Sequence, residues 1–167
     1  MCAIIGFTSK TLTADAVRPY FDRTVSRGPD ATRLEAVGSA SCLGFHRLAI
    51  MGLHEEGMQP FYLGGDAAVC NGELYGFRPV KRALEQKGYT FRSDSDCEII
   101  LPLWKEYGVE MFAKLDAEFA MVIYDAASDS LVAARDPIGI RPLFYGYLAD
   151  GGIVFASEAK NLIGLCK

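Results

Sequence analysis

Short apolar runs, separated by turn residues, constrain the fold of this sequence more than any other feature. Each run is bounded by Gly, Pro, Asp or Ser, a pattern that predicts strands. The predicted strands cover residues 3–8, 42–51, 67–70, 118–124, 131–135, 143–148 and 153–156. Turn-rich segments at 125–130 and 149–152 join neighbouring runs, so we expect antiparallel hairpins. Residues 120–123 are apolar at every position, which indicates a sheet covered on both faces.

Helical periodicity is found in three further segments. Thr13 can cap a helix over residues 14–26, whose apolar side chains recur at helical spacing. A second helix is expected over 79–87, because Pro79 lies in its first turn and Gly88 follows its end.

The third helical segment begins with a predicted capping box. Ser95 and Glu98 have the spacing of that motif, and a broad apolar stripe follows them. Pro102 inside the stripe predicts a kink or a shortened helix. Hairpins with separate helices favour an α+β domain, and strands buried on both faces favour two stacked antiparallel sheets between helix layers.

Length and charge limit the classes of protein to which this chain can belong. The chain has 167 residues, which favours one domain over residues 1–167, and half of them are hydrophobic, enough to form a core. Lys and Arg number 17 against 21 Asp and Glu, and no basic run is present, which argues against nucleic-acid binding. No segment has the roughly 20 apolar residues that cross a membrane, and no basic leader precedes an apolar segment. We therefore expect a cytoplasmic protein without a membrane or nucleic-acid partner.

The cysteines draw attention to the N-terminus. They are odd in number and lack C-x-x-C spacing, which argues against a disulfide framework and a zinc site, so no metal is expected. Removal of the initiator Met would give Cys2 a free α-amine beside its own thiol. Such an amine has a pKa of about 7.7–8.0 and can accept the thiol proton. Cys2 is therefore a candidate N-terminal nucleophile.

Other polar residues have two interpretations each. His46 and His54 could pair with a cysteine, but the apolar run around His46 favours a structural role. Asn71-Gly72 follows a predicted buried strand, where it could bind an oxyanion beyond the strand end or form a hairpin turn. Arg47 could bind a carboxylate ligand or an internal acid, and Asp96 could be a ligand group or a helix N-terminal acid.

Seven motifs, taken in chain order, resemble those of one family. They are Cys2-Ala-Ile-Ile-Gly-Phe7, Arg27-Gly-Pro-Asp30, His46-Arg-Leu-Ala-Ile50, Asn71-Gly-Glu-Leu-Tyr75, Ser95-Asp-Cys-Glu98, Ala134-Arg-Asp-Pro-Ile-Gly-Ile-Arg-Pro-Leu143 and Phe155-Ala-Ser-Glu158. Together they resemble the glutaminase domain of glutamine-hydrolysing asparagine synthetases. That domain is a class II glutamine amidotransferase with the N-terminal nucleophile hydrolase fold.

The resemblance implies a four-layer α/β/β/α sandwich and the hydrolysis of L-glutamine to glutamate and ammonia through a thioester. Cys2 would be the nucleophile and its α-amine the general base and acid. The Asn71 side chain and the Gly72 N–H would form the oxyanion hole. Arg47 would bind the α-carboxylate of glutamine. The other implied substrate-binding residues are Glu73 and Asp96, for the α-ammonium, and the backbone of Leu48, Ile50 and Met51.

The same resemblance implies what lies outside this chain. A synthetase domain or subunit would use the ammonia, with ATP and magnesium, to make asparagine from aspartate, whereas the glutaminase reaction itself needs no cofactor. Residues 135–143 equally resemble the amidophosphoribosyltransferase glutaminase, so another acceptor stays open. A non-catalytic glutamine-binding module also stays open if Met1 is retained, and the sequence leaves the oligomeric state undetermined.

Overall fold

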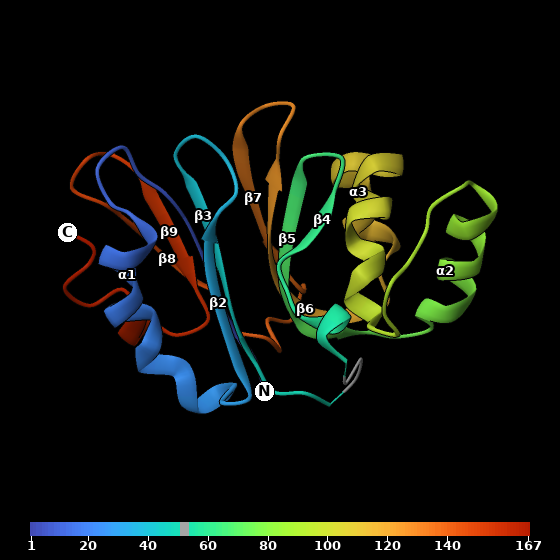
Figure 1. Ribbon diagram of the computed structural model, residues 1–167, viewed down its shortest axis with the longest axis horizontal. Helices are drawn as coiled ribbons and strands as arrows, with labels where there is room; N and C mark the ends of the chain where they lie inside the picture. Colours follow the sequence, from blue (N-terminus) through green and yellow to red (C-terminus); the bar gives the residue numbers. More distant parts are fainter. Residues whose placement is uncertain (51–53) are drawn as a thin grey trace.

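Two antiparallel β-sheets lie face to face between two layers of helices in the computed structural model, which describes residues 1–50 and 54–167 (Figure 1). Helix α1 lies against the outer face of one sheet, and helices α2 and α3 lie beyond the other. The order of layers is α/β/β/α, as the sequence predicted.

Sheet A has five strands in the order β2-β3-β1-β9-β8. Their bounds are Ala3–Thr8 (β1), Ala31–Ala36 (β2), Ser41–Arg47 (β3), Phe144–Tyr147 (β8) and Ile153–Ala156 (β9). The central strand β1 pairs with β3 and β9, so that Ile5 is opposite Gly44 on one side and Ala156 on the other.

Sheet B has four strands in the order β4-β5-β6-β7. Their bounds are Phe61–Leu63 (β4), Asp66–Leu74 (β5), Ala117–Asp125 (β6) and Ser130–Arg135 (β7). Strand β5 pairs with β6 along nearly its whole length, but β4 pairs only with residues 66–68 of β5. Among the described strands, none pairs with the other edge of β5 from residue 69 onwards.

The helical elements are short. The α-helices are α1 (Ala14–Phe21), α2 (Phe77–Gln86) and α3 (Ile100–Tyr107), and the 3-10 helices are η1 (Asp22–Arg27), η2 (Glu55–Gly57), η3 (Asp96–Ile99), η4 (Gly108–Lys114) and η5 (Ala159–Asn161). None of the described helices is both long and apolar enough to cross a membrane.

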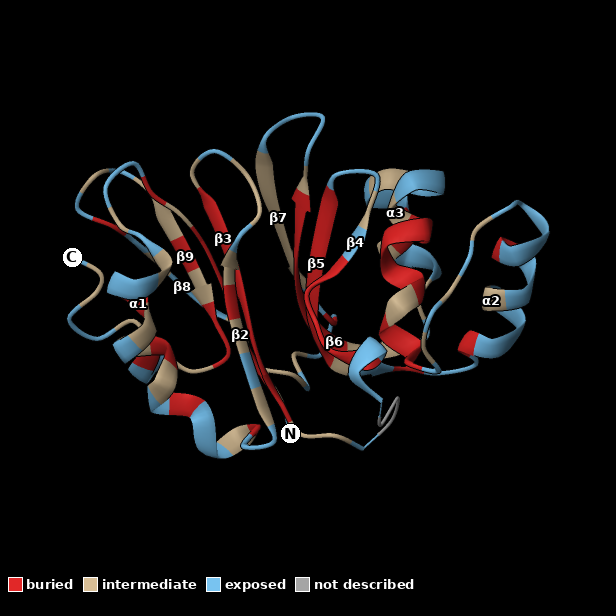
Figure 2. Ribbon diagram, in the orientation of Figure 1, coloured by how far each residue is buried: buried red, intermediate tan, exposed pale blue. Residues whose placement is uncertain are grey.

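Strand alternation divides the core between the layers, and the largely buried strands are β1, β3, β5 and β6 (Figure 2). Ile5 of β1 packs with Phe21 of the α1 layer, whereas its neighbour Ile4 packs between the sheets with Val69 and Val122. Gly6 also faces sheet B, and a Cβ there would lie 2.8 Å from a methyl group of Val122. A glycine at this position therefore lets the two sheets approach closely.

The predicted strands and hairpins are confirmed, with differences at the edges. β3 ends at Arg47, before the predicted limit at residue 51. Two strands were not predicted: β2, an edge strand with alternating polar residues, and β4, which has three residues. Both lack the continuous apolar run from which the other strands were predicted.

Two of the helix predictions require correction. Thr13 caps α1 as expected, but regular α-helix stops at Phe21 and continues as the 3-10 helix η1. The capping box is wrong, because the Glu98 carboxylate accepts the N–H groups of residues 92 and 93 and the Ser95 side chain makes no cap bond. Pro102 is the third residue of α3, where its missing N–H breaks no bond within that helix, and α3 is short, which agrees with the predicted alternative of a shortened helix.

Candidate active site

A cavity of about 160 Å³ brings most of the predicted site residues together. Its lining includes Cys2, Arg47, Leu48, Ile50, Gly72, Glu73 and Asp96, and also Met1. These residues come from the start of β1, the end of β3, the edge of β5 and the start of η3. Two predicted site residues are not among the lining residues: Asn71, which lies next to Gly72 in β5, and Met51, which lies outside the described residues.

Cys2 lies half-buried in this cavity, with its sulfur against the backbone that follows β3. The Leu48 N–H donates to the sulfur at 3.3 Å, and the thiol approaches the Leu48 carbonyl at 3.6 Å. Burial raises the pKa of the thiol, against weaker opposing effects of the Leu48 N–H, the chain's amino terminus and Arg47. A thiol with a raised pKa is mostly protonated at neutral pH, so it needs a nearby base to become a nucleophile.

Charges of both signs line the same cavity. Arg47 is the last residue of β3, is 7% exposed and donates to the His54 carbonyl at 3.1 Å. Asp96 at the start of η3 is 6% exposed and accepts the Leu74 N–H at 2.7 Å through one carboxylate oxygen. Glu73 is exposed. Arg141 also lines the cavity, so two cations and two acids border the space in front of Cys2.

Asn71 and Gly72 lie within β5, so the prediction that they follow a strand end is wrong, and so is the alternative of a hairpin turn. Gly72 is opposite Phe119 of β6. The Phe119 N–H and carbonyl both bond to Asp136, on the far side of β6. In an antiparallel ladder this directs the Gly72 N–H away from β6, towards the open edge of β5.

The N–H groups on that edge belong to alternate residues. Ala68 pairs with β4, the Cys70 N–H donates to the Gln59 side chain at 2.6 Å, and the Leu74 N–H donates to Asp96. The Gly72 N–H lies between the Cys70 and Leu74 N–H groups. In the described part of the chain no side chain accepts a hydrogen bond from it. A Cβ at Gly72 would lie 2.5 Å from the Glu118 carbonyl oxygen, so the close contact with β6 requires glycine.

The Asn71 side chain provides a second donor. Strand alternation places it on the same face of β5 as Val69, which packs between the sheets, and Cys2 packs against that cluster. Asn71 is 3% exposed, and its Nδ2 has no hydrogen-bond partner among the described residues. Buried N–H donors without a partner are rare in folded proteins, and one beside a nucleophile is a candidate for binding a developing negative charge.

Comparison with known proteins identifies the family. A family model described as the glutamine amidotransferase domain matches residues 1–167. The chain belongs to this family.

Its relatives include a probable glutamine-hydrolyzing asparagine synthetase of Acanthamoeba polyphaga mimivirus, 40% identical over 97% of this chain and 30% of the viral protein. Glutamine-hydrolyzing asparagine synthetase 1 of Bacillus subtilis is 37% identical over 98% of this chain and 27% of its own length. The chain therefore spans less than a third of these relatives.

A solved structure of B. subtilis glutamine phosphoribosylpyrophosphate amidotransferase, complexed with ADP and GMP, matches this fold. The TM-score is 0.77 at 21% identity, over 97% of this chain and 43% of that one. The likeness supports the sandwich fold of this amidotransferase domain.

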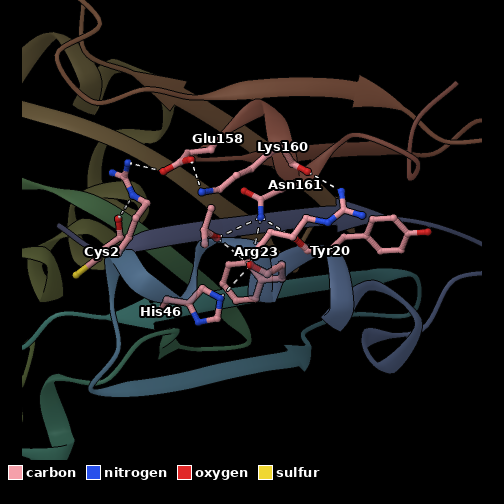
Figure 3. A network of polar contacts seen from close by, with 10 residues as sticks. Cys2, Tyr20, Arg23, His46, Glu158, Lys160 and Asn161 are labelled. Carbon is pink, nitrogen blue, oxygen red and sulfur yellow. Dashed lines mark hydrogen bonds and ion pairs between the residues drawn. The ribbon is translucent and has the colours of Figure 1, made fainter.

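Further contacts hold the start of β1 in place, and the sequence analysis had assigned them no role. Arg27 Nε donates to the Cys2 carbonyl at 3.0 Å, and Arg27 Nη1 bonds Glu158 at 3.0 Å (Figure 3). The Ile4 N–H donates to the Ser157 hydroxyl at 2.8 Å, and the Ser157 N–H returns a bond to the Ile4 carbonyl. These residues belong to the motifs at 27–30 and 155–158, so the motifs meet around the N-terminal strand.

Arg141 was missed as a cavity residue of the amidotransferase domain. Glu73 and Glu118 are directly opposite on β5 and β6, an arrangement of like charges that Arg141 offsets by bonding Glu118 at 2.5 Å. Asp136 accepts backbone N–H groups of residues 138–141 and of Phe119, and so fixes the loop that carries Arg141. These bonds outweigh burial and keep the pKa of Asp136 low.

His46 has a structural role in this amidotransferase domain, as the sequence favoured. Its ring is fully buried, stacks on Phe21 at 3.7 Å, and bonds the Phe21 carbonyl and the Thr32 hydroxyl. Burial lowers its pKa. His54 is exposed, and its carbonyl accepts a hydrogen bond from Arg47. In the described ranges no group of three or more His, Cys, Asp or Glu side chains could hold a metal ion.

Proposed function

We propose that this domain hydrolyses L-glutamine to glutamate and ammonia with Cys2 as the nucleophile. The observation that carries the proposal is the single cavity that Cys2 shares with a buried cation, two acids and the open edge of β5. Membership of the glutamine amidotransferase family supports the choice of substrate.

The charges of the cavity suit an amino-acid zwitterion. Arg47 binds the α-carboxylate, since a guanidinium matches a carboxylate with two parallel hydrogen bonds. The free oxygen of Asp96, with Glu73, binds the α-ammonium. The side chain of glutamine then extends towards Cys2.

Removal of Met1 gives Cys2 the free α-amine that the reaction needs. The amine takes the thiol proton as the sulfur attacks the carboxamide carbon, and the carbonyl electron pair moves onto oxygen. Asn71 Nδ2 and the Gly72 N–H stabilise this oxyanion. Collapse of the intermediate breaks the C–N bond, ammonia leaves with a proton from the amine, and water hydrolyses the thioester.

The acceptor of the ammonia is proposed from the relatives. Two of them are named as glutamine-hydrolyzing asparagine synthetases, which favours an ATP-dependent synthetase domain or subunit that uses aspartate. Adding candidate synthetases to the domain tests this, and acceptor-dependent stimulation by a phosphosugar enzyme instead would refute the asparagine assignment.

Ammonia release from glutamine by the purified chain tests the core of the proposal. Cys2→Ala should abolish release, whereas Cys166→Ala, a change at a half-buried cysteine in the α1 layer, should leave it unchanged. Intact mass defines the N-terminus of the same sample. A chain that keeps Met1 and still turns over glutamine would contradict the role of the Cys2 amine, and equal release by Cys2→Ala would remove Cys2 as nucleophile.

A further inference from the structure

The edge of β5 at the cavity has a side chain in the place where a neighbouring strand would be. β4 pairs with β5 only as far as Ala68. At the next outward-facing residue, Gln59 Oε1 accepts the Cys70 N–H at 2.6 Å and Gln59 Nε2 donates to the Cys70 carbonyl at 3.1 Å. A carboxamide has one acceptor and one donor side, so it reproduces the pairing of a backbone peptide.

Gln59 is well placed to control the position of the Gly72 N–H. It is 4% exposed, and it lines the cavity that contains Cys2. Outward N–H groups recur along a strand about every 6.8 Å, so the Gly72 donor lies one step beyond the bonded Cys70 group. Asp96 fixes the following step through Leu74. The Gly72 N–H therefore lies between two fixed peptides. Of the two side chains that fix them, Gln59 both accepts and donates a hydrogen bond, whereas Asp96 accepts one.

We propose that Gln59 is a positioning residue for the oxyanion hole: its carboxamide fixes the Cys70 peptide so that the Gly72 N–H and the adjoining Asn71 amide point at the reacting carbonyl. The inference rests on the proposed function of the site. Gln59 need not touch glutamine, because it acts through the backbone of β5. A small displacement of such donors reduces the stabilisation of the transition state far more than it reduces the affinity for substrate.

The test replaces Gln59 and separates the chemical step from binding. Gln59→Met keeps the approximate volume and removes both bonds, and it should lower kcat for ammonia release about 10- to 100-fold while KM for glutamine changes less than about threefold. Gln59→Glu keeps the acceptor for the Cys70 N–H and loses the donor, so its loss should be smaller. Gln86→Met, at an exposed glutamine of α2, should leave both constants unchanged.

A second measurement reports on the oxyanion hole itself. The γ-aldehyde analogue of glutamine adds the Cys2 sulfur to its carbonyl carbon, and the thiol proton completes a hemithioacetal whose oxygen takes the oxyanion position. Its affinity should fall in parallel with kcat in the Gln59 variants. Alkylation of Cys2 by iodoacetamide expels iodide and forms no oxyanion, so its rate should be unchanged.

Asn161→Ala is the control for a loss of stability alone, because it removes a buried carboxamide from the α1 layer. That variant should melt earlier and keep its kcat. If Gln59→Met does not fold, Gln59→Glu carries the comparison. Full kcat in a folded Gln59 variant, or equal losses in kcat and iodoacetamide reactivity, would overturn the role of Gln59 alone. A wild-type chain that releases no ammonia would overturn the proposed function, and the role of Gln59 with it.

Discussion

Asn71 and Asn161 are both buried asparagines, and they use their amide donors in opposite ways. Asn161 Nδ2 donates to the Tyr20 and Phe21 carbonyls at 2.8 and 3.2 Å and to the Thr24 hydroxyl at 3.1 Å (Figure 3). Asn71 Nδ2 has no partner among the described residues. Asn161 Oδ1 also has none there, so the contrast concerns the donors.

The difference separates a region that stabilises the fold from the region to which we assign the proposed chemistry. In the α1 layer, Asn161 joins η5 to the backbone of α1 and to the Thr24 side chain of η1, and its bonds lower the free energy of the folded state. An unpaired buried N–H costs about 1–3 kcal/mol. The fold bears this cost at Asn71, and under the proposed function the bound substrate supplies the missing acceptor.

Among the variants considered, replacement of Asn71 should change kcat the most. Asn71→Ala removes one oxyanion donor, so kcat should fall about 10²–10³-fold, while the melting temperature should hold or rise because an unpaired polar group is lost. Steady-state ammonia release and thermal unfolding measure the two quantities. A variant that is unstable but fully active would reverse the roles assigned to the two asparagines.

Two arginines extend the comparison to charge. Arg47→Ala should raise KM for glutamine about 10- to 100-fold, because a charged hydrogen bond to the α-carboxylate is lost. Arg23 of the α1 layer donates to the Lys160 and Ile163 carbonyls at 2.7 and 2.6 Å, and Arg23→Ala should leave KM unchanged. Unaltered selectivity for glutamine over analogues without the carboxylate would remove Arg47 from the site.

Asn161→Ala should show the reverse pattern to Asn71→Ala. We expect a loss of about 2 kcal/mol in the free energy of unfolding, since the Tyr20 and Phe21 carbonyls and the Thr24 hydroxyl lose a donor. The kcat should stay within about twofold of wild type. Denaturant unfolding measures the first quantity, and a strong loss of kcat without a loss of stability would show that the two regions are coupled.

The smallest expected effect is a pH dependence of stability from His46. Burial lowers its pKa below 6.5, against weaker opposition from the Phe21 carbonyl and Asp22, while Arg18 acts in the same direction as burial. As pH falls below about 6.5 the unfolded chain binds the proton first, so stability decreases towards the lower pKa of the folded state. His46→Gln should reduce this slope in melting temperature, and His54→Gln, at an exposed site, should not. An identical slope in both variants would assign it to other groups.

Much of the contrast between the structural region and the site could be predicted from the sequence. Apolar runs predicted the strands of both sheets, and the apolar neighbours of His46 predicted its structural role. The edge strands β2 and β4 escaped because an edge strand is half exposed and needs no continuous apolar run.

The positions of the hydrogen-bond donors in the site depend on the strand register, which could not be predicted from the sequence. Asn71-Gly72 has the composition of a turn, yet long pairing with β6 keeps it in a strand. Motif resemblance selected Cys2, Arg47 and Asp96, whereas Gln59 had no signal beyond its place before Pro60. The role that we propose for it rests on two hydrogen bonds to Cys70, eleven positions away.

The clamped edge of β5 also bears on how the protein stays dispersed. An unpaired strand edge attracts a strand of another molecule, the first step of ordered aggregation. A cavity that must expose one such N–H cannot cover the whole edge with a strand. Gln59 and Asp96 occupy the groups on either side of it, so an incoming chain finds no continuous ladder to extend. Under the proposed function, the same two side chains limit self-association through this edge and leave the Gly72 N–H open to a small ligand.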